Sequence, residues 1–107
     1  MSAVRPASEL EIHDGVLKIQ GELSFETIPA VLAETTEFAA RPDLPERITI
    51  DFGAITGVDS SAVALLLEWR RTALKRGKTL EFTNLPANLL ALAELYGVAD
   101  LIQPARA

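Results

Sequence analysis

Two different hydrophobic repeats follow each other in the middle of the chain, and their order limits the folds that it can adopt. Apolar residues alternate in ERITIDF (46–52), which predicts a strand because successive side chains of a strand point to opposite faces. Apolar residues then recur at helical spacing over residues 60–76, and TLEFT (79–83) is a second short strand. Strands joined by a helix make right-handed crossovers, so we expect a partly parallel sheet.

The N-terminal part adds a hairpin and a helix. Asp14-Gly15 lies between alternating apolar residues, the strongest short hairpin signal, and predicts antiparallel strands over 9–13 and 16–22. Apolar residues at helical spacing predict a helix over 28–40, with Thr27 as its cap and an end before Pro42. The doubled first strand makes the expected sheet mixed.

The C-terminal part completes the fold class. Asn84-Leu85-Pro86 precedes a helix over 86–96 that ends at Gly97, and residues 98–102 form a short apolar segment expected to pack on the core. The segment GAITGV (53–58) is interpreted as a short connection because it holds two glycines. We therefore expect an α/β domain over 9–103, with a mixed sheet of four or five strands, three main helices and a flexible tail over 1–8.

Composition excludes several classes of function. The chain has no cysteine, a single histidine and a net charge of −5, which excludes disulfides, thiolate metal sites and a broad nucleic-acid surface. One basic cluster runs against this trend, and it comprises Arg70, Arg71, Lys75, Arg76 and Lys78. The longest apolar run, 62–67, is far too short to span a bilayer, and no signal peptide is visible. We expect a cytoplasmic protein without membrane insertion.

Catalytic groups are sparse. Ser60 and Ser61 lack a Gly-x-Ser-x-Gly elbow, and His13 sits beside a hairpin turn with no reason to approach them. Asp51 and Asp59 could approach the same sheet edge as an acid/base pair, although nothing else in the sequence supports that reading. No phosphate-binding glycine loop exists. We predict a protein that is not an enzyme and needs no cofactor.

The segment VDSSAVALLLEW (58–69) carries the remaining information. Aspartate and serine are preferred helix caps, so Asp59-Ser60-Ser61 is first a helix start. The helix has two apolar stripes instead of one, the second formed by Val63, Leu67 and Leu74. Either the helix is central and buried, or its first turns also face a partner. A phosphate on Ser60 would suit the positive helix end and could switch such a contact.

The stretch from residue 48 to residue 82 resembles the STAS domain, in which a strand, a short loop with Asp-Ser-Ser or Asp-Thr, an apolar helix and a strand follow one another. Anti-sigma factor antagonists of this family carry Asp-Ser-(Ser/Thr)-Gly-Leu-Gly, whereas here Ala62-Val63-Ala64 follows the serines. The Val58–Leu67 segment and Leu92-Ala93-Glu94-Leu95-Tyr96-Gly97-Val98 are more similar to the stand-alone STAS subunit of the Mla phospholipid ABC transporter.

That resemblance implies an accessory subunit that contacts the transporter's cytoplasmic ATPase subunit at the inner membrane. The contact would use the hydroxyl of Ser60 and the first helical turns, with help from helix 86–96. The residues expected at this contact are Asp59, Ser60, Ser61, Val63, Ala64 and Leu67. The alternatives are an anti-sigma factor antagonist, phosphorylated by a serine kinase on Ser60 or secondarily on Ser61, and a small enzyme or nucleotide-binding protein.

Overall fold

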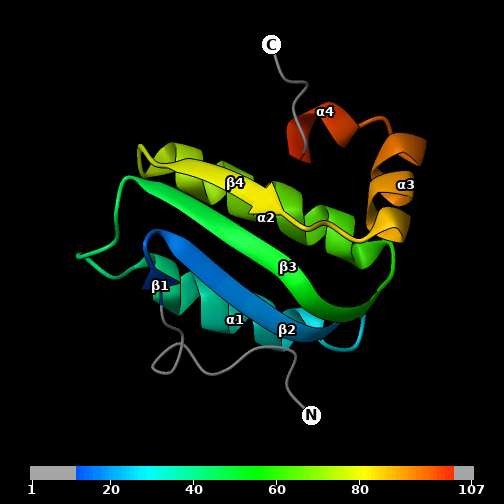
Figure 1. The fold of residues 1–107 in the computed structure, drawn as a ribbon, viewed down its shortest axis with the longest axis horizontal. Coiled ribbons are helices and arrows are strands. Elements are labelled where there is room, and N and C mark those ends of the chain that lie inside the picture. The colour runs from blue at the N-terminus through cyan, green and yellow to red at the C-terminus, as the bar shows by residue number, and fades with distance from the viewer. Residues whose placement is uncertain (1–11, 103–107) are drawn as a thin grey trace.

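The computed structural model describes residues 12–102 as one layer of sheet and one layer of helices (Figure 1). Four strands lie in the order β1-β2-β3-β4, with β1 antiparallel to β2 and the other neighbours parallel. In chain order the elements are β1 (Ile12–His13), β2 (Val16–Leu23), α1 (Ile28–Ala39), β3 (Arg47–Val58), α2 (Ser61–Lys75), β4 (Thr79–Thr83), α3 (Ala87–Leu95) and α4 (Ala99–Ile102).

This arrangement confirms the expected mixed α/β class. Asp14 and Gly15 both have positive φ, 53° and 78°, as a two-residue turn between twisted strands requires. Gly77, at φ 70°, ends α2 as predicted, and Ile102 is buried at the end of the short apolar segment. Residues 1–11 and 103–107 lie outside the described part, and so do the predicted tail and the beginning of the predicted strand 9–13.

Two local predictions were wrong. The glycine-containing segment 53–58 is not a connection, because β3 continues to Val58 and pairs with β2 from Thr49 to Val58, where it lies opposite Leu23. Two register shifts in this pairing accommodate the long strand, and Gly21 in β2 adopts φ 93° beside one of them. Thr27 occupies the N-cap position of α1 but makes no capping bond, because its hydroxyl bonds Ser24 N and Glu22 O instead.

The core lies between the sheet and the helices. Leu17, Ile19, Ile50 and Phe52 point from the strands toward α1 and α2, which both lie behind the sheet in Figure 1. Helix α2 is the central helix, because it contacts α1, α3 and α4, and five of its residues are buried: Ala62, Val63, Leu65, Leu66 and Trp69. The helix is thus central and buried, as one interpretation of the sequence held. Its second apolar stripe is buried only in part, because Val63 is buried, Leu67 is half-buried and Leu74 is 65% exposed.

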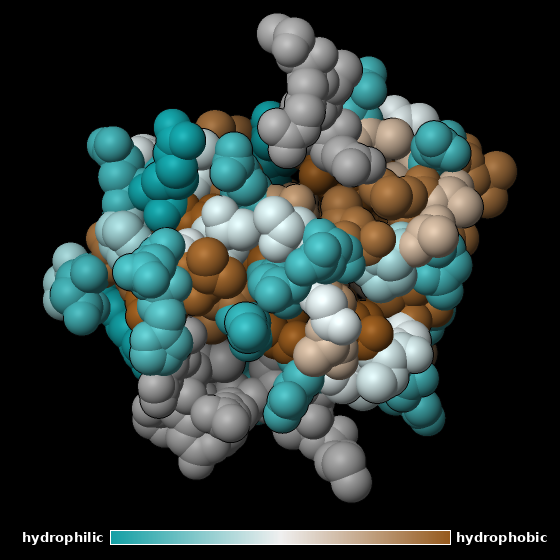
Figure 2. All heavy atoms as spheres, viewed as in Figure 1, coloured by the Kyte–Doolittle hydropathy of each residue, from teal (hydrophilic) through white to brown (hydrophobic). Residues whose placement is uncertain are grey.

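Within residues 12–102, no helix covers the opposite face of the sheet. The strand residues that point to it are mostly polar and include Lys18, Gln20, Thr49, Asp51 and Glu81. Figure 2 looks onto this face, with hydrophilic residues over much of the sheet and hydrophobic residues gathered over α3 and α4. Leu95 at the end of α3, Tyr96 after it and Leu101 in α4 are each more than two fifths exposed.

Candidate functional site

The start of α2 lies at the end of the sheet where β2 and β3 finish. Asp59 follows the last residue of β3, and its backbone N–H donates to the carbonyl of Leu23 at the end of β2. The parallel pairing of β2 and β3 therefore fixes where α2 begins. It also brings the loop after β2, residues 24–27, beside the serines of the sequence motif.

The carboxylate of Asp59 joins this loop to the helix. Its Oδ1 accepts from the backbone N–H of Ser61 at 2.9 Å and from the Ser61 hydroxyl. Its Oδ2 accepts from the backbone N–H of Phe25 at 2.8 Å. These donors favour the charged carboxylate and lower the pKa of Asp59, the Ser61 hydroxyl most and then the Phe25 N–H. Asp59 is thus the side chain that caps α2.

The two serines differ in their surroundings. Ser60 stands at the N-cap position without a side-chain capping bond and is exposed, whereas Ser61 is half-buried with its hydroxyl held by Asp59. Capping falls to Asp59 rather than to a serine because Ser60 already has helical backbone angles, φ −62° and ψ −24°. The hydroxyl presented to solvent at the helix start is that of Ser60.

The other residues that the sequence predicted at this site differ in their exposure. Ala64 is exposed one turn after Ser60, and Leu67 is half-buried. Val63 is only 4% exposed and belongs to the core cluster, so it fixes the helix against the sheet. Sequence reasoning missed Phe25, which is 79% exposed although it is large and apolar. Its signal was an aromatic residue between Ser24 and Glu26, outside any hydrophobic repeat. Phe25, Asp59, Ser60, Ser61 and Ala64 are called the helix-start site below.

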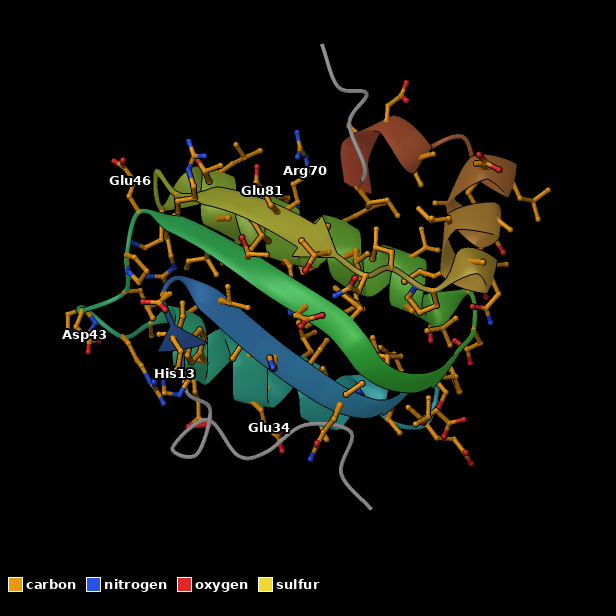
Figure 3. All side chains as sticks on the ribbon, in the orientation of Figure 1. His13, Glu34, Asp43, Glu46, Arg70 and Glu81 are labelled. Atoms are coloured by element: carbon orange, nitrogen blue, oxygen red, sulfur yellow. The ribbon has the colours of Figure 1, made fainter. Side chains whose placement is uncertain are left out.

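The groups considered for catalysis are not assembled here. His13 pairs with Val16 at the beginning of β2, whereas the serines follow the end of β3, so the sheet separates them; Figure 3 labels His13 beside β1. Asp51 lies within β3, eight residues before Asp59, which is on the order of 25 Å along an extended strand. Among residues 12–102 no three His, Asp or Glu side chains form a cluster that could hold a metal ion.

Asp51 has its own set of partners on the open face of the sheet. Its Oδ1 accepts from the Asn84 amide at 2.8 Å and from the backbone N–H of Gly53 at 2.8 Å. The Asn84 amide is the largest cause of a lowered pKa of Asp51, and the Gly53 N–H is the next. The positive charge of Lys18 lowers the pKa slightly further. The group fixes the end of β4 to the middle of β3 and is separate from the helix-start site.

None of the helices in residues 12–102 combines the length and the hydrophobicity of a transmembrane span. Comparison with curated proteins finds no match. Among solved structures, an unphosphorylated form of the anti-sigma factor antagonist SpoIIAA is similar, with a TM-score of 0.69 and 19% sequence identity over 92% of this chain and 87% of that one. This identity shows a shared fold.

The family comparison is more specific. A family model described as "Mlab, STAS domain" matches residues 7–103, nearly the whole chain. The match agrees with the resemblance seen in the strand, Asp-Ser-Ser and apolar helix. The protein therefore belongs to the STAS domain family, in the group that this MlaB-type model describes.

Proposed function

We propose that the protein is a non-enzymatic accessory subunit that binds the ATPase subunit of an Mla-type phospholipid ABC transporter, on the cytoplasmic side of the inner membrane. Two features support the choice of partner. The matching family model carries the MlaB description. The Val58–Leu67 segment and the Leu-Ala-x-Leu-Tyr segment near the end resemble the stand-alone STAS subunit of such transporters.

One observation carries the choice of surface. Asp59 bonds the backbone of Phe25 and caps α2 at the same time, and both Phe25 and Ser60, the neighbours that it joins, have exposed side chains. Exposed aromatic residues are enriched at protein interfaces, where they supply large contact areas. Ala64 extends the surface by one turn, and its small side chain allows a partner to approach the helix closely.

A second apolar surface lies at the same end of the sheet. Helix α3 follows β4, whose end pairs with the middle of β3, and α3 contacts α2. Leu95 is 75% exposed and Tyr96 is 54% exposed at the end of α3. We place this corner at the edge of the same contact, in line with the help expected from helix 86–96.

Co-purification with the ATPase subunit tests the proposal. Ser60→Lys puts a bulky charge in the middle of the helix-start site and should abolish the complex. Phe25→Ala should weaken binding by about tenfold or more, the usual loss for an aromatic interface anchor. Thr83→Lys is the matched control, because Thr83 is exposed at the end of β4 and lies outside the helix-start site. It adds the same charge and should leave the complex intact.

The fold of each variant is checked by circular dichroism and thermal unfolding before binding is measured. If folded Ser60→Lys and Phe25→Ala bind the ATPase like the wild type, the helix-start site is not the contact surface. If the wild type itself does not bind, the proposed partner is wrong.

The alternative function is that of an anti-sigma factor antagonist switched by phosphorylation. The exposure of Ser60 favours this residue as the phosphate acceptor over Ser61, whose hydroxyl is bonded to Asp59. The helix N-terminus would stabilise an added phosphate, whereas Asp59 would repel it. Incubation with the cognate anti-sigma kinase and ATP, followed by mass spectrometry of Ser60→Ala and Ser61→Ala variants, separates this function from the first.

A further inference from the structure

The outer edge of β4 is a part of the sheet that the helix-start site does not involve. Strand β4 (Thr79–Thr83) pairs with Arg47–Asp51 of β3 on one side, and within residues 12–102 no strand pairs with its other side. Its partners lie in the first half of β3, whereas the helix-start site follows the last residue of β3. The outer edge of β4 is therefore a separate surface.

The backbone of β4 offers hydrogen-bonding groups along this edge. The N–H of Thr79 donates to the carbonyl of Glu46 at 2.9 Å, so Thr79 turns its backbone groups toward β3. The backbone groups of successive strand residues point to opposite sides, and those of Leu80 and Phe82 therefore point outward. Their N–H and C=O groups are available to an added strand.

The two edges of the sheet differ in how well they could accept another strand. In the described part of the chain β1 has two residues, whereas β4 has five and pairs with β3 without a register shift. Edge strands commonly avoid further pairing through bulges, prolines and charged side chains. Strand β4 has neither a bulge nor a proline, and Glu81 is its only charged residue. It is therefore suited to pairing with an extended segment.

Helix α2 provides side chains next to this edge. The helix packs against β4, and in Figure 3 the Arg70 side chain extends past the outer edge of the strand. Arg70 and Leu74 share one flank of α2 because they are four residues apart. They lie about 100° and 140° around the helix from Trp69, which bonds Thr35 of α1, so their flank does not face α1.

The flank is incompletely satisfied in the structure. Leu74 is exposed although it is apolar. Arg70 is half-buried, and no carboxylate between residues 12 and 102 forms an ion pair with it. Arg70 also belongs to the basic cluster of the sequence, for which the helix-start site offers no role.

These surroundings define the chemistry of an added strand. Its side chains would alternate between the helix side and the open face of the sheet. On the helix side, an apolar residue would cover Leu74 and an acidic residue would pair with Arg70. On the open face, a basic residue opposite Glu81 would make a favourable cross-strand pair. Charge complementarity therefore selects a segment with an acidic and a basic residue at neighbouring positions and apolar residues around them.

A second copy of this chain fits the edge poorly. Antiparallel pairing of two β4 strands over their full length places Glu81 opposite Glu81 of the second copy. Like charges directly opposite each other destabilise a strand pair. A register shifted by two residues separates these carboxylates but pairs only residues 79–81 or 81–83 of each copy. A segment of different sequence avoids both problems.

From this geometry we propose that the outer edge of β4 binds an extended segment of another protein, which adds a strand to the sheet. The segment pairs with the outward backbone groups of Leu80 and Phe82 and presents its acidic residue to Arg70. The inference does not depend on the protein that binds the helix-start site.

Amide hydrogen exchange measured by NMR tests the edge directly. In the free protein the amides of Leu80 and Phe82 should exchange much faster than that of Glu81, whose N–H points toward β3. The probe is the capped peptide Val-Thr-Glu-Lys-Val-Thr-Val, which has the required alternation in antiparallel pairing. At a concentration of about ten times its Kd, it should slow exchange at Leu80 and Phe82 by roughly tenfold.

N-methylated peptides separate strand pairing from other modes of binding. In the antiparallel pair the backbone N–H of the peptide glutamate donates to β4, whereas that of the neighbouring lysine points away. N-methylation of the glutamate should therefore abolish the protection of Leu80 and Phe82. N-methylation of the lysine is the matched control and should leave the protection intact.

Charge reversal locates the flank of α2. Arg70→Glu should weaken binding of the peptide by roughly tenfold, and a peptide with lysine in place of glutamate should bind this variant more tightly than the original peptide does. Lys18→Glu makes the same charge change on β2 and is the matched control, because β2 lies inside the sheet between β1 and β3. It should bind the original peptide like the wild type. Circular dichroism verifies that both variants are folded, and Arg70→Gln should show a smaller loss.

Several outcomes would overturn the proposal. If the Leu80 and Phe82 amides already exchange slowly in a free monomer, the chain itself covers the edge. If they exchange slowly in a dimer detected by sedimentation, the occupant is a second copy. The proposal also fails if the peptide does not bind, or binds without protecting these two amides. Equal binding of the original peptide by folded Arg70→Glu and Lys18→Glu would exclude the role of Arg70.

Discussion

The two ends of α2 are built differently although one helix connects them. At its start, a single carboxylate holds Ser61 and the backbone of Phe25, and the contacts are short and polar. At its end, small side chains leave a mostly apolar pocket of about 90 Å³ between α1 and α2, and the charged residues of its lining are Glu68, Arg76 and Lys78. One end is fixed by hydrogen bonds and exposes its side chains, whereas the other keeps apolar space inside.

The middle of the helix explains how both ends are tolerated. Leu65 and Leu66 are buried, and the ring centroid of Trp69 lies 6.3 Å from that of Phe52. The Phe52 ring in turn meets the Phe82 ring edge-on, with 5.7 Å between centroids. This packed segment holds α2 on the sheet.

The largest effect that we expect comes from this middle segment. Leu66→Ala removes a fully buried side chain and should lower the free energy of unfolding by about 2–5 kcal/mol. Ala73→Met adds volume at the pocket, where room exists, and should change it by less than about 1 kcal/mol. Urea unfolding of both variants measures the difference. Similar losses for the two variants would mean that the pocket is packed as tightly as the core.

The next effect concerns the polar end of the helix. Asp59→Ala should cost about 1–2 kcal/mol, because it removes a cap and leaves the Phe25 N–H without its acceptor. Asp59→Asn should cost less, since asparagine also caps helices. Urea unfolding at pH 7 gives the stabilities, and amide hydrogen exchange reports the Phe25 N–H. Exchange at Phe25 that is equally slow in Asp59→Ala and in the wild type would contradict the assigned bond.

The sequence predicted those parts of the fold that depend on local pattern. The Asp14-Gly15 turn, the wide apolar face of α2 and the stop at Gly77 each follow from residues within a few positions of one another. The extension of β3 to Val58 was missed because it depends on pairing with β2, which is distant in sequence. Glycine signals a turn locally, yet a paired neighbour can hold it in a strand.

The site was predicted in part for the same reason. Asp59, Ser60 and Ser61 stand together in the sequence, so their place at a helix start could be read directly. The division of roles between them could not, because it depends on the Ser60 backbone angles and on the N–H of Phe25, 34 residues away. The pocket between α1 and α2 is formed by the way the two helices pack on the sheet, and no single stretch of the sequence predicts it.

The smallest change in stability that we expect concerns Asp51, a second hydrogen-bonded carboxylate that lies away from the helix start. Asp51 also has a lowered pKa, chiefly through the Asn84 amide, but it lies on the open face of the sheet. A carboxyl whose pKa is lower in the folded state stabilises the protein above its unfolded pKa, near 3.8, and this contribution disappears as pH falls through the folded value. Both Asp51 and Asp59 should therefore contribute at neutral pH and not in strong acid.

Asn84→Gly removes the side-chain bond to Asp51 without straining the backbone, because Asn84 has a positive φ of 56° that glycine adopts readily. We expect a loss of up to about 1 kcal/mol at pH 7, since the bond is solvent-exposed. Part of that loss, from the greater freedom of glycine in the unfolded chain, does not depend on pH. The part due to Asp51 should vanish in acid.

Urea unfolding between pH 2 and 7 (roughly the range over which carboxyl groups titrate) measures the free energy of unfolding of each variant. Asp51→Asn is the control background, in which Asn84→Gly should have no pH-dependent effect. A loss that is constant with pH would show that the bond between Asp51 and Asn84 contributes no stability.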